Sequence, residues 1–194
     1  DLHLLNNRFK PNFSPAEDEG YITLTTHNYQ AKRINEEHLK KLNTKLHRFR
    51  CTIQGDFPEY AYPADEILEV KNGAQVMFLK NDASVEKRYY NGKIGKVVNI
   101  ADGQIEVLCP GDAEPITVEP DVWENSRYNL NETSGEIDEE IVGKFIQFPL
   151  KLAWAITIHK SQGLTFEKAI IDARQSFAHG QVYVALSRCK SLNG

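Results

Sequence analysis

Apolar and polar positions divide the chain into three zones, of which the first ends near residue 70. Residues 21–25 form a short run of alternating, largely β-branched side chains that predicts a strand. Apolar residues then recur at the spacing of one face of a helix, for which we expect Asn28 to be the N-cap: Ala31, Ile34, Leu39, Leu42 and Leu46. Residues 51–66 contain one glycine and two prolines and predict a loop. A strand followed by an amphipathic helix is typical of the α/β class.

The second zone, residues 71–147, has a different periodicity. Short apolar runs are separated by Asn-Gly, Asp-Gly and Pro-Gly pairs, which are turn signals. The runs predict strands at 74–79, 96–100, 104–108 and 116–118. Several short strands at close spacing favour a small β-barrel. Because α/β character resumes afterwards, we predict that this barrel is an insertion.

The third zone runs from residue 148 to residue 194. Residues 153–158 predict a strand that enters a polar turn, and residues 168–172 are a compact apolar run suited to a buried parallel strand. Residues 180–188 predict a helix with an apolar stripe. We therefore expect an α/β domain made of residues 1–70 and 148–194, interrupted by a small barrel at 71–147.

Charge is distributed unevenly along the chain. The formal net charge of −4 gives no global argument for nucleic-acid binding. Residues 32–50, however, contain seven basic and two acidic side chains, whereas residues 102–140 contain twelve acids and one base. One end of the fold could therefore meet phosphates while the other repels them, although two solvated faces of opposite charge explain the pattern equally well.

Composition excludes several classes of site. No apolar run is long enough for a membrane span, and the opening residues are not typical of a signal peptide, so we expect a bacterial cytosolic protein, or a nuclear or mitochondrial one in a eukaryote. Three distant cysteines, Cys51, Cys109 and Cys189, form no metal-binding pattern. We expect no metal ligands and no structural zinc in this chain.

The polar turn after residue 158 is the first segment with candidate chemistry. His159, Lys160, Ser161 and Gln162 stand together and are followed by Gly163, which allows close backbone approach to a ligand. At the carboxyl end of a strand, such a turn suits a phosphate or a nucleic-acid backbone. A solvated loop without any ligand remains the alternative on composition alone.

Arg188 is the second candidate. An arginine near the end of a helix can favour the helix C-terminus, or it can project to a phosphate and neutralise charge in a transition state. Taken alone, the residue does not distinguish these two roles.

Together these segments resemble a known family. Residues 157–166 read TIHKSQGLTF and residues 183–192 read YVALSRCKSL, which resemble motifs V and VI of superfamily 1 helicases, above all the Pif1/RecD-like branch. Residues 24–39 resemble the motif IV region, and residues 72–98 resemble the start of an SH3-like insertion. Residues 2–9 resemble the junction that leaves the first RecA-like domain. The chain is therefore expected to be the C-terminal half of such a helicase.

The resemblance implies a role for each matching residue. Arg188 corresponds to the arginine finger that reaches the γ-phosphate of ATP, and Gln162 and Gly163 correspond to the nucleotide side of motif V. The expected contacts to single-stranded DNA are Thr25, Thr26, Asn28, Lys93, His159, Lys160 and Ser161. The implied cofactor is ATP with Mg²⁺, the implied partner is an N-terminal RecA-like domain, and the implied movement is 5′ to 3′.

One departure from the complete helicase pattern concerns activity. The chain contains no G-x-x-x-x-G-K-[ST] sequence and no acidic pair after an apolar strand. Without a phosphate-cradling loop or magnesium ligands, phosphoryl transfer lacks both positioning and charge neutralisation, so we expect this chain alone not to hydrolyse ATP. Two alternatives stay open: a non-motor module that binds nucleic acid or protein, and a RecD-like subunit of a nuclease-helicase complex.

Overall fold

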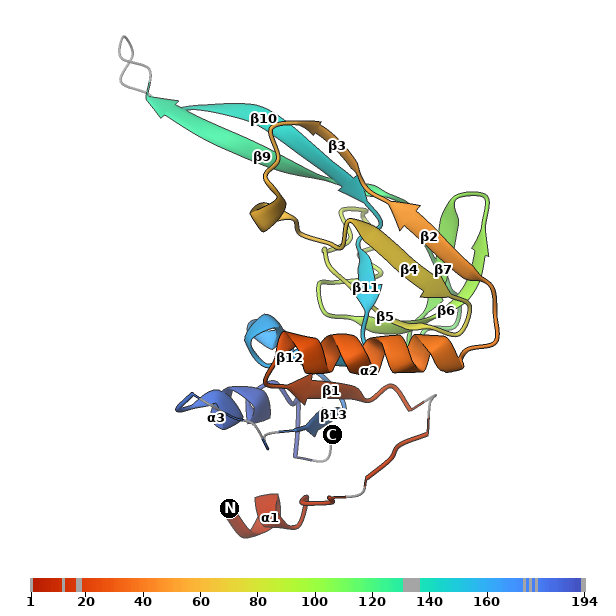
Figure 1. The fold of residues 1–194 in the computed structure, drawn as a ribbon, viewed down its shortest axis with the longest axis vertical. Coiled ribbons are helices and arrows are strands. Elements are labelled where there is room, and N and C mark those ends of the chain that lie inside the picture. The colour runs from red at the N-terminus through yellow and green to blue at the C-terminus, as the bar shows by residue number, and fades with distance from the viewer. Residues whose placement is uncertain are drawn as a thin grey trace. The chain divides into compact units, whose positions relative to one another are not determined.

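The computed structural model describes residues 2–11, 13–16, 19–130, 137–172, 174, 176 and 178–192 (Figure 1). The chain divides into two compact units: unit 1 comprises Asp1–Lys41 and Ala153–Gly194, and unit 2 comprises Leu42–Leu152. The insertion is therefore longer than the predicted 71–147. The reason is long-range pairing, because β2 (Leu46–Arg50) pairs with β4 (Ile67–Lys71) and β3 (Thr52–Gly55) pairs with β10 (Ile137–Gln147).

Unit 1 is built on a three-stranded parallel sheet in the order β12-β1-β13. Its strands are β1 (Ile22–Thr25), β12 (Ala155–Thr157) and β13 (Ala169–Ile171). The predicted strands at 21–25, 153–158 and 168–172 are thus confirmed, as is the parallel direction. The outer strand β13 is only half-buried rather than buried. The apolar side chains of β1 and β12 form the centre of this core.

Helix α2 (Asn28–Lys41) packs against β1 and β12 with its buried face around Ala31 and Leu39 (Figure 1). The carbonyl of His27 accepts the backbone N–H of Ala31, so His27 rather than Asn28 precedes the first turn. The predicted continuation through Leu46 is wrong, because the helix ends at Lys41 and Leu46 opens β2. The sequence from Leu46 also fits strand alternation, and pairing with β4 decides between the two patterns.

The segment 51–66 is only partly the predicted loop. It contains β3 and the short 3-10 helix η1 (Glu59–Ala61). All four residues of β3 are exposed, so the strand has no apolar alternation that sequence inspection could detect. Its conformation depends on the hydrogen bonds to β10.

Unit 2 contains a five-stranded antiparallel sheet in the order β11-β5-β6-β7-β8. The strands are β11 (Leu150–Leu152), β5 (Gln75–Phe78), β6 (Ile94–Ala101), β7 (Gln104–Leu108) and β8 (Ile116–Val118). All four strands predicted for this zone are therefore confirmed. Phe78, Ile105 and Val107 are fully buried in its core.

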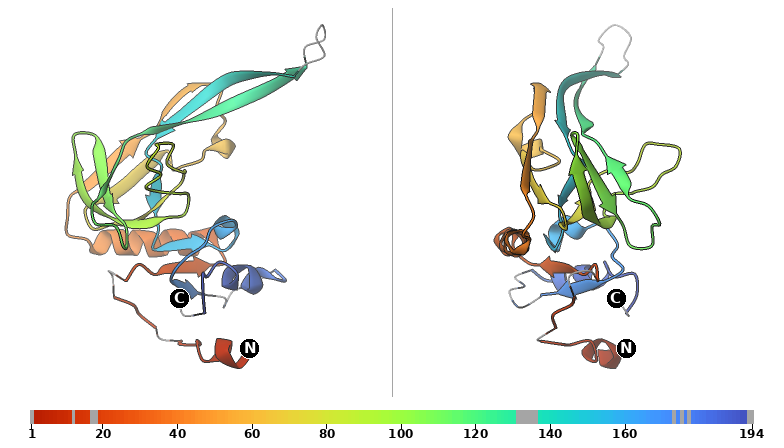
Figure 2. Two further views of the ribbon diagram at one scale, coloured as in Figure 1. Left: turned by 180° about the vertical axis from the view of Figure 1, so that it is seen from behind. Right: turned by 90° about the vertical axis from the view of Figure 1, so that its right-hand side faces the viewer.

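Unit 2 also contains a long β-ribbon that sequence inspection did not predict. Strand β9 (Asp121–Leu130) pairs antiparallel with β10, and the pair continues past the end of β3 (Figure 2). At its base, Phe145 lies 6.0 Å from Trp123 and 4.9 Å from Tyr62, measured between ring centroids. The ribbon carries much of the acidic stretch noted in the sequence.

Three short helices complete unit 1. They are α1 (Leu2–Asn6), the 3-10 helix η2 (His159–Ser161) and α3 (Gln181–Leu186). The predicted helix at 180–188 is confirmed but ends earlier, so Arg188 lies in the turn that follows it. Among the residues that the structure describes, none of the helices has the length and apolar character that crossing a membrane requires.

Candidate functional site

The carboxyl ends of β1 and β12 lie side by side in unit 1. Thr25 is in register with Thr157, and the backbone N–H of Ile158 donates to the carbonyl of Thr25 at 2.8 Å. The turns that follow the two strands therefore begin at one edge of the sheet. In open parallel sheets this edge is where ligands bind.

The predicted DNA-contacting residues at this edge divide into exposed and buried ones. The side chains of Asn28, His159 and Lys160 are exposed. In contrast, Thr25, Thr26 and Ser161 are buried. These three side chains are placed to shape the turns rather than to present themselves to a ligand.

The buried hydroxyls have partners within the protein. Ser161 Oγ donates to the carbonyl of Ile158 at 2.7 Å, and Thr26 Oγ1 donates to Gln30 Oε1 at 3.2 Å. The backbone N–H of Lys160 donates to Thr157 Oγ1 at 3.3 Å. The turn that carries His159 and Lys160 is thus fastened to the end of β12.

The two segments singled out in the sequence are joined by backbone hydrogen bonds. The N–H of Phe166 donates to the carbonyl of Arg188 at 2.8 Å, and the N–H of Lys190 donates to the carbonyl of Phe166 at 2.9 Å. Phe166 and Cys189 therefore form a parallel β-bridge. The structure brings Arg188 next to the turn of residues 162–164.

Arg188 is half-buried and bonded only to neutral acceptors. Its guanidinium donates to the carbonyls of Leu164 and Val184, each at 3.3 Å, and to Ser187 Oγ at 3.0 Å. Within the described ranges, 137–172 and 178–192 included, it forms no ion pair. Its charge is held in a fixed place and is not neutralised by a neighbouring carboxylate, which suits an anionic ligand.

Gln162 and Gly163 are both exposed in the same turn. Gly163 has a φ of +80°, in the left-handed region, and a side chain there would meet no atom within 4 Å. Its glycine is therefore explained by backbone conformation rather than by crowding. An exposed turn beside a fixed guanidinium is an arrangement that suits a phosphate group.

Comparison with known proteins identifies the family. No protein-family model matches the chain. The chain is 38% identical over 182 residues to the human ATP-dependent DNA helicase PIF1, and this alignment covers 88% of this chain and 26% of that protein. It is also 31% identical over 189 residues to the Pif1 helicase of Campylobacter jejuni, covering 91% of this chain and 41% of that protein.

This chain belongs to the Pif1-like helicase family. Its structure matches that of unliganded Pif1 from Bacteroides sp. with a TM-score of 0.90 and 41% identity, covering 100% of this chain and 44% of the other. A Bacteroides Pif1 structure in complex with ADP-AlF3 and single-stranded DNA has a TM-score of 0.74 at the same identity and covers 100% of this chain and 43% of the other. The chain thus spans less than half the length of these Pif1 relatives.

Lys93 is the one predicted site residue of this Pif1-like chain that lies in unit 2. Its ammonium is 2.7 Å from Asp112 Oδ2 and donates to the carbonyl of Arg88 at 2.7 Å. Lys93 is therefore engaged in holding a turn of unit 2. A DNA contact by this side chain would require it to leave Asp112.

The described residues of the Pif1-like chain contain no group of three His, Cys, Asp or Glu side chains that could hold a metal ion. Near the sheet edge, Asp172 follows β13, and hydrogen bonds from the Arg174 side chain hold the pKa of its carboxyl below the usual range.

Sequence inspection missed Asn35, a positioning residue on α2. Its Nδ2 donates to the carbonyl of Ala155 at 2.9 Å, and its Oδ1 accepts the N–H of Ala155 at 2.8 Å. The amide therefore holds the helix against the strand that leads to His159. No local pattern marks it, because its partner lies 120 residues away.

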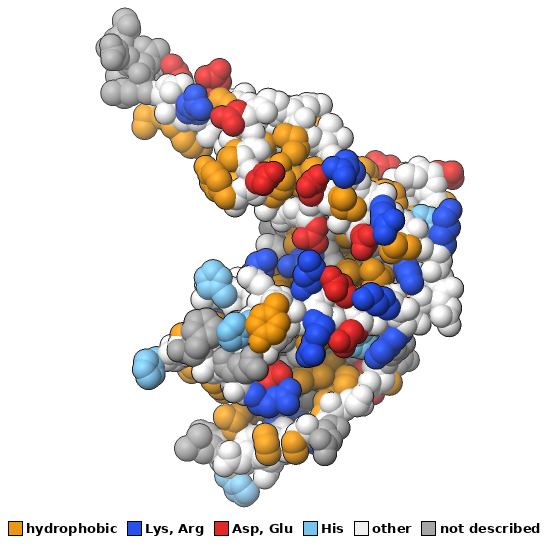
Figure 3. All heavy atoms as spheres, in the orientation of Figure 1, with side chains coloured by type: hydrophobic (Ala, Val, Ile, Leu, Met, Phe, Trp, Pro, Cys, Tyr) orange, Lys and Arg blue, Asp and Glu red, His pale blue; other side chains and the backbone are white. Residues whose placement is uncertain are grey.

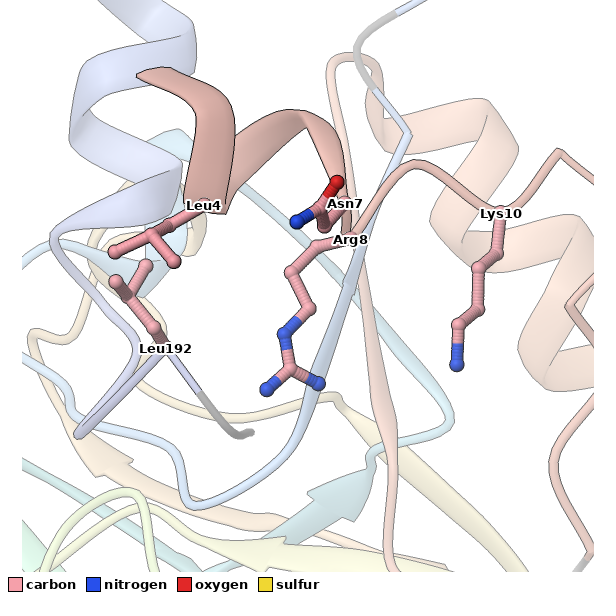
Figure 4. Close-up of a pocket in the computed structure, with 5 residues that line it drawn as sticks. All are labelled: Leu4, Asn7, Arg8, Lys10 and Leu192. Carbon is pink, nitrogen blue, oxygen red and sulfur yellow. The ribbon is translucent and has the colours of Figure 1, made fainter. Parts of the chain in front are cut away.

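A separate shallow hollow of about 430 Å³ lies in unit 1 (Figure 4). Leu4 and Leu192 point toward one another across it, while Arg8 and Lys10 extend from the segment after α1. None of the predicted site residues lines this hollow. It lies where the family resemblance expects the chain to leave the first RecA-like domain.

Proposed function

We propose that this chain is the C-terminal motor part of an ATP-dependent DNA helicase. Unit 1 acts as the second RecA-like domain, and unit 2 carries an SH3-like insertion. The proposal is supported by the parallel sheet, by the joined 157–166 and 183–192 segments, and by the Pif1 relatives. The Bacteroides relative in complex with ADP-AlF3 and single-stranded DNA supports nucleotide and DNA as ligands.

The proposal depends mainly on the environment of Arg188. Its guanidinium is fixed by three neutral acceptors beside an exposed turn. An arginine so placed acts as an arginine finger, because it brings positive charge to the γ-phosphate as negative charge develops in transfer. Gln162 and Gly163 would line the nucleotide on the same side.

The phosphate-binding loop must come from elsewhere. When bound, Mg²⁺ neutralises charge on the β- and γ-phosphates, and the described residues of this chain contain no group of three His, Cys, Asp or Glu side chains that could hold it. An N-terminal RecA-like domain of the same protein would provide the loop and the ligands of Mg²⁺. The chain by itself is therefore expected to show no ATP hydrolysis.

The DNA track is assigned to the carboxyl edge of the sheet. Asn28, His159 and Lys160 are exposed there and would contact the phosphate backbone of single-stranded DNA. Thr25, Thr26 and Ser161 would act by holding the turns, and Lys93 would join only after leaving Asp112. We also propose that the motor moves in the 5′ to 3′ direction. Comparing the unwinding of substrates that carry a 5′ tail with that of substrates that carry a 3′ tail tests this direction.

DNA-stimulated ATP hydrolysis tests the finger assignment. In the natural protein that contains this chain, Arg188→Ala should lower kcat by about 10³-fold or more while DNA binding is retained. Arg174→Ala is the matched control, since that arginine is exposed and bonded to Asp172. If Arg188→Ala behaves like the control, Arg188 is not the finger, and a non-motor binding module becomes the better account.

A further inference from the structure

An aromatic pair stands at the DNA-facing edge of the sheet, and the roles proposed so far do not use it. His27 lies two residues after the end of β1, and Tyr29 lies in the first turn of α2. The ring centroids of His27 and Tyr29 are 5.5 Å apart, with an interplanar angle of 47°. Tyr29 is 60% exposed, so its ring is accessible to a ligand.

The pair is adjacent to the cationic turn. Because the carbonyl of Thr25 accepts the N–H of Ile158, residue 27 begins its turn beside the one that carries His159 and Lys160. Figure 3 shows histidine side chains gathered on the side of unit 1 where α2 begins. Aromatic rings next to basic side chains are the combination that binds single-stranded nucleic acid.

The histidine of the pair is held in a defined orientation. Thr26 Oγ1 lies 2.8 Å from His27 Nδ1 and donates its own proton to Gln30 Oε1. The Thr26 hydroxyl therefore links the His27 ring to the first turn of α2. Since Thr26 is buried, this arrangement fixes the imidazole plane against which Tyr29 is tilted.

We propose that Tyr29, supported by His27, stacks on a base of the single-stranded DNA whose phosphates contact His159 and Lys160. This inference rests on the proposed DNA track. Stacking needs a base with an exposed face, so the pair favours single strands over duplexes and accepts any of the four bases. The exposed Tyr29 ring then contributes to the affinity for single-stranded DNA without sequence specificity.

Fluorescence anisotropy with the natural protein tests the stacking contact. The probes are a labelled oligo-dT and an oligonucleotide of the same length in which every base is missing. Tyr29→Ala should bind oligo-dT about tenfold more weakly, which is the effect of one lost aromatic stack. Tyr29→Phe should bind like the parent, because it keeps the ring.

The base-free probe separates stacking from phosphate contact. Tyr29→Ala and the parent should bind the base-free probe with equal affinity. Lys160→Ala should bind both probes more weakly, and its affinity should depend less on salt concentration. Tyr128→Ala is the control, since that tyrosine is 66% exposed but belongs to unit 2. Equal losses on both probes, or no loss for Tyr29→Ala, would overturn the stacking role. If the parent binds neither probe, the DNA track itself is wrong.

Discussion

Asn35 and Arg188 show how single side chains position this site through backbone atoms. Asn35 uses both polar atoms of its amide on Ala155, and Arg188 holds the carbonyls of Leu164 and Val184. In each case the side chain fixes a segment distant in sequence. The geometry of the exposed residues therefore depends on side chains that need not touch a ligand.

Replacement of Asn35 by alanine should destabilise the chain by about 2 to 6 kcal/mol. Ala155 is buried, and its N–H and carbonyl would each lose a partner, at about 1 to 3 kcal/mol per unsatisfied group. Urea denaturation measures the change. Glu36→Ala, at an exposed neighbouring position, is the control. A difference between the two variants below about 0.5 kcal/mol would show that the bridge is not needed.

The buried thiol of Cys109 should make the free energy of unfolding depend on pH in the alkaline range. Burial raises the pKa of Cys109 from 9.0 to about 11. Above pH 9 the unfolded chain loses the thiol proton while the folded chain keeps it, so unfolding becomes more favourable. The free energy of unfolding of the parent should therefore fall between pH 9 and pH 11, relative to Cys109→Ala. Parallel curves for the two proteins over this interval would contradict the burial effect.

At the scale of elements, β10 passes close to the Asp56 backbone at Gly143. The pairing of β10 with β9 shifts its register between Ile141 and Gly143, and a Cβ added at Gly143 would overlap the carbonyl group of Asp56. The three nearest atoms all belong to the backbone of Asp56, so there is no flexible side chain that could move away. The turn between β3 and η1 is thus closed against the ribbon.

Gly143→Ala should destabilise unit 2 by about 2 to 3 kcal/mol because the added methyl overlaps backbone atoms. Gly103→Ala provides the comparison, since Gly103 has a φ of +76° but open space around it. Left-handed strain alone costs about 1 kcal/mol. Thermal or urea unfolding measures both variants, and equal losses would mean that the contact with Asp56 relaxes freely.

Local patterns predicted some elements and missed others for a physical reason. The strands at 104–108 and 116–118 have alternating apolar side chains that face a core, and both appear as predicted. The exposed strand β3 and the acidic ribbon β9–β10 depend on hydrogen bonds between segments far apart. Such pairing leaves no periodic signal in either segment.

The same distinction applies to the site. Short contiguous motifs placed Arg188 and the turn at 159–163, and the structure joins these segments through Phe166. Burial of Thr25, Thr26 and Ser161 could not be predicted, because polar side chains do not reveal how they are bonded. Tyr29 was missed because one exposed ring within a helical pattern has no periodic meaning.

At the scale of the whole molecule, the chain consists of one unit inserted into another. Unit 2 is a single continuous stretch, residues 42–152, with its own sheets and buried aromatic side chains. Unit 1 is assembled from two stretches that flank it. The strands of its sheet come from both stretches, since β1 precedes the insertion and β12 and β13 follow it.

Residues 42–152 expressed alone should fold and unfold cooperatively. The prediction follows because the core of this stretch is supplied by residues within it. Phe145→Ala should lower the stability of the fragment by about 3 to 5 kcal/mol, since this ring is fully buried. Circular dichroism during urea unfolding measures both proteins. A broad, non-cooperative transition in the fragment would show that unit 2 requires its host.

The insertion also sets an order for folding during synthesis. Strand β1 and helix α2 leave the ribosome before unit 2, but β12 and β13 follow only after all of unit 2 has emerged. Unit 2 is complete as soon as residue 152 is available, so it can fold while unit 1 is still unfinished. During that interval α2 has β1 but not β12 to cover its apolar face, so this face is open to chaperone binding until β12 emerges.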